Sequence, residues 1–178
     1  MRKTCVFITG TNAAGKTTVA KELQRCFGGL ANVSPMISTC KDAAVCFAGK
    51  YDAGKYGGVD SLNSTKVLAG IVEQALTSHD VIICEGSYLH TFGNNLTNAL
   101  FKAERFIVIF LYAPIKVLNE RLIARGGTGI NEGIAKKQLT CAHSLAKWQS
   151  IGVEARVYDT SKNSAAVIAN RIIKLLNE

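Results

Sequence analysis

Hydrophobic and polar positions follow one another along the chain in blocks typical of strands and helices in turn. Short apolar runs lie at 4–9, 80–86, 105–112 and 154–160, and a weaker run lies at 32–38. Between them, apolar positions recur at helical spacing at about 16–27, 63–78, 94–103, 114–125, 132–149 and 163–177. Continuous apolar strands separated by helices predict an α/β fold, with a five-stranded parallel sheet covered by helices on both faces.

Two segments do not fit this alternation. Residues 47–62 are rich in Gly, Lys and Tyr, and we expect 42–62 to form an arm on the substrate side. Residues 126–133, GGTGINEG, separate two predicted helices and predict a short lid. Because no linker or charge block marks a boundary, we expect residues 1–178 to form a single domain.

Charge and cysteine content indicate which kinds of partner and which cellular compartment to expect. The formal net charge of +8 favours an anionic partner such as nucleotide, nucleic acid or acidic lipid, although solubility alone could account for it. The six cysteines lie far apart, several within apolar runs, which is typical of free buried thiols. With no signal-peptide pattern and no long apolar run, we expect a reduced, cytoplasmic protein that does not enter membranes.

The stretch GTNAAGKTT follows the first predicted strand and opens a helix, and it fits the pattern Gly-x4-Gly-Lys-Thr of phosphate-binding loops. In such a loop the backbone N–H groups bind phosphate oxygens, Lys16 reaches the β and γ phosphates, and the Thr17 hydroxyl binds Mg²⁺. The sequence therefore predicts binding of ATP and Mg²⁺. The residues expected to bind the nucleotide here are Gly10, Thr11, Asn12, Ala13, Ala14, Gly15, Lys16, Thr17 and Thr18.

Gly-Lys occurs twice more in AGKYDAGKYGG at 48–58. Lys50 and Lys55 are each followed by tyrosine, so neither copy offers a hydroxyl to a metal, and no strong strand precedes them. Cations that alternate with Tyr51 and Tyr56 suit a nucleic-acid strand or a nucleotide base. An ordinary solvated surface loop is the alternative.

Three carboxylates are candidates for the chemistry. Glu85 ends the apolar run VIICE and is expected to lie near Mg²⁺, where strand capping is the alternative. Asp42 either caps a helix beginning at 43 or accepts the proton of an attacking hydroxyl, and the sequence leaves these open. Asp60 is expected to contact the substrate.

Arg121 and Arg125 lie four residues apart on one predicted helix face, directly before the glycine-rich lid. Guanidinium groups at the root of a lid can close over phosphates and stabilise charge in the transition state, and Arg125 is the one we expect to be catalytic. Pairing with a nearby surface carboxylate is the alternative.

These motifs, with LYAPIKVLNERLIAR and VYDTSKNSAAVI, resemble the P-loop nucleoside, nucleotide and polynucleotide kinases over nearly the whole chain. The resemblance implies a three-layer fold with sheet order 2-3-1-4-5. It also implies that Arg121 lies against the adenine, that Arg125 contacts phosphates, and that the loop of Asp159, Thr160 and Ser161 borders the base of ATP.

The arm ending in YGGVD also resembles that of the bacteriophage kinases that phosphorylate the hydroxymethyl group of 5-hydroxymethyluracil in DNA. This resemblance implies a DNA substrate, a role in DNA modification and action in the host cytoplasm. A kinase of nucleosides or nucleoside monophosphates is the alternative within the same chemistry. An ATP-dependent nucleic-acid-binding switch is the alternative from another class.

Overall fold

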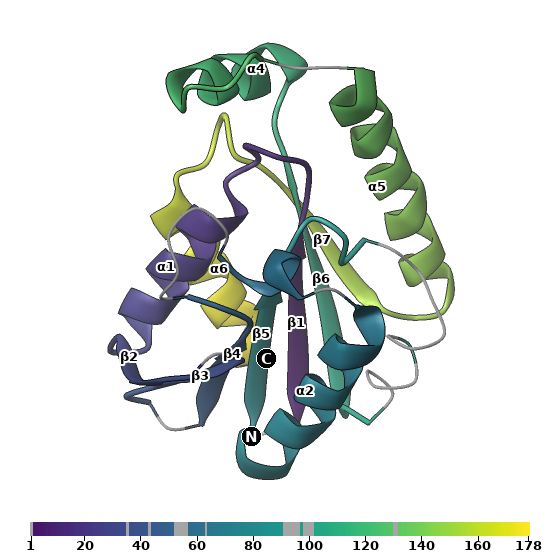
Figure 1. The fold of residues 1–178 in the computed structure, drawn as a ribbon. Coiled ribbons are helices and arrows are strands. Elements are labelled where there is room, and N and C mark those ends of the chain that lie inside the picture. Colours follow the sequence, from purple (N-terminus) through teal and green to yellow (C-terminus); the bar gives the residue numbers. More distant parts are fainter. Residues whose placement is uncertain are drawn as a thin grey trace.

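The structure, a computed structural model, describes residues 2–34, 36–42, 44–51, 57–62, 64–90, 97, 102–129 and 132–178. Figure 1 shows a central sheet with helices against both of its faces. The strands are β1 (Thr4–Thr9), β2 (Leu30–Val33), β3 (Ile37–Cys40), β4 (Val45–Ala48), β5 (Val81–Glu85), β6 (Arg105–Tyr112) and β7 (Glu154–Asp159). The helices are α1 (Lys16–Cys26), a short 3₁₀ helix η1 (Val59–Ser61), α2 (Thr65–Ser78), α4 (Ile115–Ala124), α5 (Glu132–Ser150) and α6 (Ala165–Leu176).

The sheet has seven strands in the order β2-β3-β4-β5-β1-β6-β7, and it is mixed. Strands β4, β5, β1, β6 and β7 run parallel, whereas β2 and β3 pair antiparallel with each other and β3 pairs antiparallel with β4. The prediction of a purely parallel, five-stranded sheet is therefore wrong. Counted among themselves, however, the five parallel strands follow the expected order 2-3-1-4-5.

The second parallel strand is β4, at 45–48, and not the predicted run at 32–38. Residues 32–38 instead contain the turn between β2 and β3, in which the Ser34 hydroxyl donates to Ile37 O at 2.5 Å and accepts from Ile37 N at 3.0 Å. Strand β4 falls at the start of the segment interpreted as an arm. Its four residues are all buried, as expected for an inner strand of a covered sheet.

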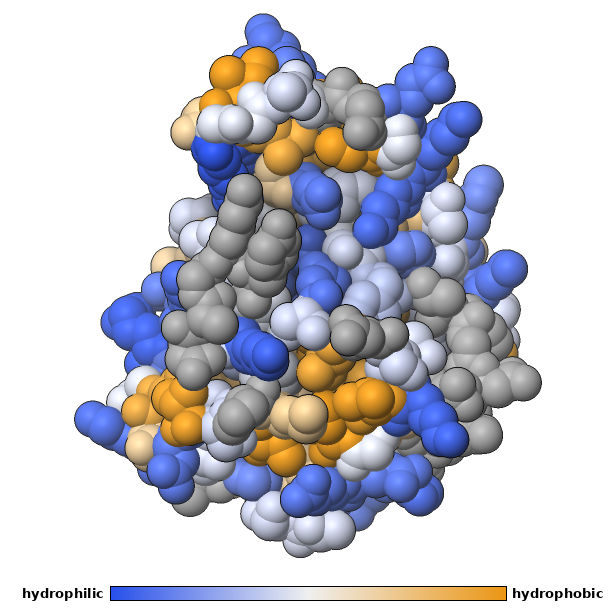
Figure 2. Space-filling model, viewed as in Figure 1, coloured by the Kyte–Doolittle hydropathy of each residue, from blue (hydrophilic) through white to orange (hydrophobic). Residues whose placement is uncertain are grey.

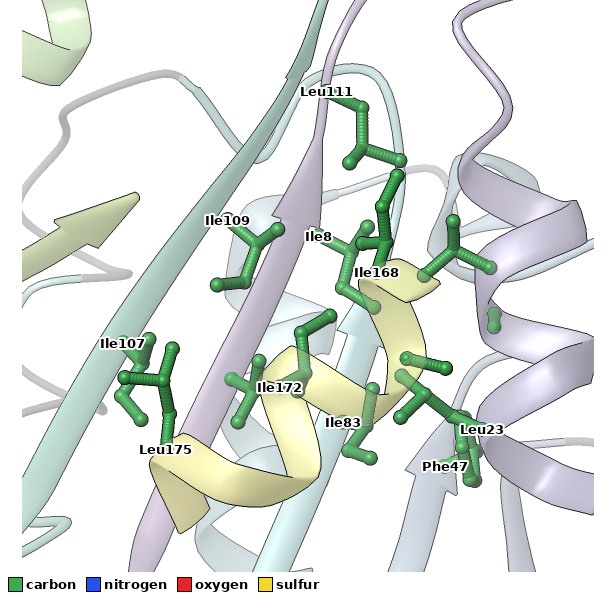
Figure 3. Packing of buried hydrophobic residues seen from close by; sticks show 14 of the residues in the cluster. Ile8, Leu23, Phe47, Ile83, Ile107, Ile109, Leu111, Ile168, Ile172 and Leu175 are labelled. Carbon is green, nitrogen blue, oxygen red and sulfur yellow. The ribbon is translucent and has the colours of Figure 1, made fainter. Parts of the chain in front are cut away.

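Alternate residues of the inner strands bury against different helices, which gives the three layers. Ile8 of β1 and Ile109 of β6 pack in one cluster with Ile168 of α6 and Leu23 of α1. Figure 3 shows these side chains converging between the sheet and α6. The opposite face of the sheet packs against α2 and α5, and there Trp148 of α5 meets Phe106 edge to face at 5.3 Å.

Five of the predicted helices correspond to α1, α2, α4, α5 and α6. Most of the helix predicted at 94–103 lies outside the described residues. All six cysteines are free thiols, and five of them are buried. In the part of the chain that the structure describes, no helix is long and apolar enough to span a bilayer.

Candidate active site

The phosphate-binding loop joins the end of β1 to the start of α1 through residues with positive φ. Gly10, Ala13 and Gly15 have φ values of 149°, 63° and 93°. A Cβ on Gly10 would stand 2.4 Å from Leu111 O, so the loop can lie this close to β6 only with glycine at that position. Because α1 begins at Lys16, directly after this curl, the N–H groups of its first turn are available to an anion.

Lys16 is folded back over the loop. Its side chain is buried, and its Nζ donates to Gly10 O at 3.2 Å and to Thr11 O at 3.1 Å. Burial lowers the pKa of Lys16, while the charges of Asp60 and Glu85 oppose that shift. Both carboxylates are therefore close enough to act on the ammonium group, which lies where a phosphate chain over the loop would meet it.

Glu85 lies at the carboxyl end of β5, next to the start of α1. The Thr17 hydroxyl donates to Glu85 Oε1 at 3.1 Å. Glu85 is 1% exposed, and burial raises its pKa, while Lys16 and the bond from Thr17 oppose that rise. The carboxyl ends of the parallel strands β1 and β5 meet at this edge, which explains how residues 68 positions apart come into contact.

The oxygens of Thr17 and Glu85 are of the kind that Mg²⁺ prefers, and they lie side by side. Among the described residues no group of three or more His, Cys, Asp or Glu side chains could hold a metal ion. In phosphoryl-transfer sites Mg²⁺ is bound by one or two protein oxygens together with nucleotide phosphates and water.

Asp60 lies in η1, and Ser87 fixes its side chain from the segment after β5. Asp60 Oδ1 accepts from Ser87 N at 2.6 Å and from Ser87 Oγ at 3.1 Å. Asp60 faces a cavity of about 610 Å³ that it shares with the phosphate-binding loop and the lid. Figure 2 shows this face of the molecule hollowed below α4. The cavity is lined by Asn12, Ala13, Lys16, Thr17, Gly57, Asp60, Leu122, Arg125, Gly126 and Gly127.

Two positions within the predicted arm, Lys50 and Gly58, meet at the same place. Lys50 and Gly58 form an antiparallel bridge, with N to O distances of 3.0 Å from Lys50 to Gly58 and 2.7 Å in the other direction. A Cβ on Gly58 would stand 2.4 Å from Glu85 Oε1, and one on Gly49 would stand 2.4 Å from the carbonyl carbon of Gly58. The glycines let the arm lie directly against the candidate metal carboxylate. Sequence reasoning missed Gly58, although the GG pair before Asp60 was a visible signal.

The arm residues predicted to bind substrate divide into three cases. The Tyr51 ring packs edge to face on Phe47 at 5.4 Å, and its hydroxyl is buried. The ring is half-buried and packs against the core cluster, so only part of it is open to stacking, and its role in substrate binding stays a prediction. Lys50 is half-buried at the bridge. Lys55 and Tyr56 lie outside the described residues.

Asp42 does not lie with the other candidates. It precedes β4, its N–H donates to Phe27 O at 3.2 Å, and its own carbonyl accepts from Val45 N at 3.0 Å. Phe27 directly follows α1, whose other end carries Lys16, so Asp42 lies at the opposite end of the sheet from the phosphate-binding loop. The structure therefore does not support Asp42 as the proton acceptor. Strand β4 starts where the capped helix was expected.

Arg121 connects α4 to the phosphate-binding loop and to the loop after β7. Its Nη1 donates to Ala13 O at 3.2 Å and to Thr160 Oγ1 at 2.9 Å, and its Nη2 donates to Thr160 O at 2.8 Å. These groups border a second cavity of about 310 Å³, on the other side of the phosphate-binding loop. It is lined by Ala13, Gly15, Thr18, Val19, Arg121, Arg125, Thr160, Asn163, Ser164, Ala165 and Ile168.

Arg125 lines both cavities and is exposed, and its side chain forms no ion pair or hydrogen bond with the described residues. It is thus available to an anion that extends from one cavity to the other.

The side chain of Asp159 forms its hydrogen bonds within its own turn, where Oδ1 accepts from Ser161 N at 2.8 Å and from Ser161 Oγ at 2.6 Å. These bonds lower the pKa of Asp159 and make it a support of the loop.

Comparison with known proteins agrees with this geometry. A family model described as an AAA domain matches residues 6–138. The 5-hmdU DNA kinase 1 of Salmonella phage ViI is 26% identical over 146 residues, which cover 77% of this chain and 66% of that protein.

Two solved structures show the same fold. The YorR protein of Bacillus subtilis, in complex with phosphorylated GDP, has a TM-score of 0.63 and 18% identity, with 97% of this chain and 95% of that chain covered. The deoxyadenosine kinase of M. mycoides, with bound dCTP, has a TM-score of 0.52 and 15% identity, with 98% and 100% covered.

Proposed function

The chain belongs to the AAA domain family and is a P-loop kinase in fold and in phosphate-binding site, and we propose that it phosphorylates 5-hydroxymethyluracil in DNA. The reaction would use ATP and Mg²⁺ and transfer the γ-phosphoryl group to the hydroxymethyl oxygen. The observation that carries the proposal is the 610 Å³ cavity, where Lys16, Asp60 and Arg125 surround the space beside the phosphate-binding loop. The named relative from phage ViI supports the choice of acceptor.

Each of the two cavities would bind one of the two substrates. The 310 Å³ cavity beside Arg121 and Thr160 suits the base and ribose of ATP, and the phosphates would run along the loop toward Lys16. The acceptor would enter the larger cavity, opposite the γ phosphate, as in-line displacement requires. Mg²⁺, when bound, would neutralise charge on the β and γ phosphates, and Thr17 and Glu85 would hold it.

Asp60 is the carboxylate that suits proton transfer. Ser87 holds one of its oxygens, and its other oxygen has no hydrogen-bond partner among the described residues. As the acceptor oxygen bonds to the γ phosphorus, its proton would pass to Asp60, and the bond between the γ phosphorus and the β–γ bridging oxygen would break to leave ADP. Arg125 would contact the phosphoryl group in transit.

To test this, the protein is incubated with γ-labelled ATP and Mg²⁺ and with one of four acceptors in parallel. These are duplex DNA containing 5-hydroxymethyluracil, unmodified DNA with free 5′-hydroxyl ends, nucleosides, and nucleoside monophosphates. Label on the modified base supports the proposal, and its absence there with label elsewhere rejects it. Digestion to nucleosides would show whether the label is on the base or on a strand end.

The same assay tests the alternatives. A nucleoside or nucleoside monophosphate kinase is favoured by the fold shared with the deoxyadenosine kinase of M. mycoides, and it would label only a monomer. A nucleotide-dependent DNA-binding switch would release phosphate from ATP and label no acceptor. If DNA is the substrate, the protein acts on it in the cytoplasm of the host cell.

A further inference from the structure

The short helix η1, which carries Asp60, is held by the three residues that follow β5, here called the η1 seat. Gly86 lies directly against it, since a Cβ on Gly86 would stand 2.5 Å from Val59 Cγ2 and 2.9 Å from Asp60 Oδ1. Ser87 donates to Asp60 Oδ1 through its N–H and its hydroxyl. The Tyr88 hydroxyl donates to Val59 O at 3.0 Å. The η1 seat therefore binds both the carboxylate of Asp60 and the backbone next to it.

The η1 seat is itself fixed at both of its ends. Gly86 N donates to Ile8 O at 3.1 Å, which joins the seat to β1. At the other end Leu89 is fully buried, and His90 Nδ1 bonds to Ser87 O at 2.6 Å. A carbonyl only accepts, so Nδ1 carries the hydrogen, and burial lowers the pKa of His90, so the ring is neutral at pH 7. The seat is thus a firm support for η1.

Helix η1 depends on such a support because it is a single turn. Val59 O accepts from Leu62 N at 2.9 Å, which closes the turn. A 3₁₀ turn this short has few hydrogen bonds of its own, so contacts from outside must hold its shape. The side chain of Val59 is buried in the core cluster, and the Tyr88 hydroxyl reaches its carbonyl oxygen. The turn that carries Asp60 is therefore fixed to the body of the protein at Val59.

Tyr88 can act on the reaction only through other residues. Its ring is half-buried and packs against the core cluster. Among the described residues, Asp60 lines the 610 Å³ cavity and Tyr88 does not. Burial raises the pKa of Tyr88, and the nearby charge of Asp60 raises it further, so the hydroxyl keeps its proton and remains a donor. The bond to Val59 O is thus present over the whole range of pH in which a kinase works.

Given the proposed function, in which Asp60 takes the proton of the acceptor, we propose that Tyr88 is a positioning residue for this carboxylate. Its hydroxyl holds the carbonyl of Val59 and, with it, the turn that presents Asp60 to the acceptor oxygen. A displacement of about 1 Å in a reacting group can cost on the order of a hundredfold in rate. Loss of the hydroxyl should therefore slow phosphoryl transfer without changing the donor site.

A double-mutant cycle with Asp60 tests this role. Tyr88→Phe removes the hydroxyl and keeps the ring, so kcat should fall about tenfold or more while KM for ATP keeps its wild-type value. In the Asp60→Asn variant, Tyr88→Phe should lower the remaining rate less than about twofold, because the carboxylate that it positions is gone. Tyr158→Phe removes the hydroxyl of another half-buried tyrosine, on β7, and should match wild type.

The cycle distinguishes positioning from a general structural role. Equal losses with and without Asp60→Asn, an unchanged kcat in Tyr88→Phe, or a raised KM for ATP would each overturn the inference. If wild type phosphorylates an acceptor other than 5-hydroxymethyluracil in DNA, the proposed acceptor is wrong, and the cycle is run with the acceptor that is labelled. The proposed acceptor and the role of Tyr88 are thus judged separately.

Hydrogen exchange measured by mass spectrometry tests the contact without any substrate. In Tyr88→Phe, peptides that cover residues 57–62 should exchange about five- to tenfold faster than in wild type, as expected for the loss of one hydrogen bond. Peptides from α6 should exchange at the wild-type rate, and Tyr158→Phe should leave 57–62 unchanged. Wild-type exchange at 57–62 in Tyr88→Phe would overturn the inference even before an acceptor has been identified.

Discussion

Gly58 lies against Glu85 so closely that a Cβ on Gly58 would stand 2.3 Å from the carbonyl oxygen of Glu85 and 2.4 Å from Oε1. Gly58 also has φ of 70°, a conformation that other residues rarely adopt. Because Glu85 accepts from Thr17 at 3.1 Å, the arm, the end of β5 and the start of α1 meet at one point. The position of the arm is therefore coupled to the candidate metal site.

Gly58→Ala should disturb the active site, although it adds only one methyl group. The added methyl group must push the arm away from Glu85 or turn the carboxylate away from Thr17. We expect a loss of about 1–3 kcal/mol of unfolding free energy from the strained backbone. We also expect a raised Mg²⁺ requirement in phosphoryl transfer, which Mg²⁺ titrations of the rate will measure.

Gly70→Ala is the matched control. Gly70 lies within α2, and a Cβ there would meet no atom within 4 Å. Alanine is favoured over glycine inside a helix by about 0.5–1 kcal/mol, so this variant should be more stable and fully active. If both variants behave alike in activity, close packing of Gly58 on Glu85 has no functional importance.

Lys16→Ala should abolish phosphoryl transfer and leave the fold intact. The side chain makes hydrogen bonds only within its own loop among the described residues, so its loss removes no long-range hydrogen bond. Loss of the charge at the β and γ phosphates should lower kcat by about a hundredfold or more. Circular dichroism and thermal melting would show whether the protein stays folded, with Lys21→Ala on the exposed side of α1 as the control. Turnover near the wild-type level would reject the site.

Asp60→Asn should lower kcat by about a hundred-fold or more while the protein remains folded, because an amide cannot take the acceptor proton. The amide oxygen can still accept from Ser87, so the local structure should persist. Asp42→Asn, at the other end of the sheet, should keep wild-type rates. A reversed result, with Asp42→Asn inactive and Asp60→Asn active, would contradict the assignment of the base.

Local motifs predicted the part of the site that depends on short stretches of sequence. Gly10 and Lys16 belong to one loop whose backbone geometry follows from the positions of its glycines. The meeting of Thr17 with Glu85 was also predictable, because strands that alternate with helices bring their carboxyl ends to one edge. The order of the five parallel strands was predicted from the resemblance to the P-loop kinases, and the observed order agrees with it.

The errors come from contacts distant in sequence. Strand β4 has only four residues, and the Gly- and Lys-rich stretch after it made the whole segment resemble a loop. Once β4 was missed, Asp42 was assigned to the wrong end of a strand. The packing of Tyr51 on Phe47, four residues before it, depends on the path of the chain after β4, which composition does not encode. The roles of Ser87 and His90 arise from a string of bonds that has no sequence motif.

His90 should make stability depend on pH, with a sign set by its lowered pKa. The unfolded chain has a histidine pKa near 6.5 and binds a proton more readily than the folded protein. The unfolding free energy that His90 contributes is therefore present above pH 6.5 and is lost as the pH falls through that value. His90→Asn does not titrate, and its amide can still donate to Ser87 O.

Urea unfolding between pH 5 and 8 would measure the unfolding free energies of wild type and of His90→Asn. The difference between the two values gives the contribution of His90, because the titration of other groups such as Glu85 affects both proteins alike. The unfolding free energy of wild type should fall further than that of His90→Asn on going from pH 7.5 to 5.5. His143→Asn, which removes an exposed imidazole from α5, is the control. A difference that stays constant with pH, or grows in favour of wild type as the pH falls, would mean that burial does not keep His90 neutral.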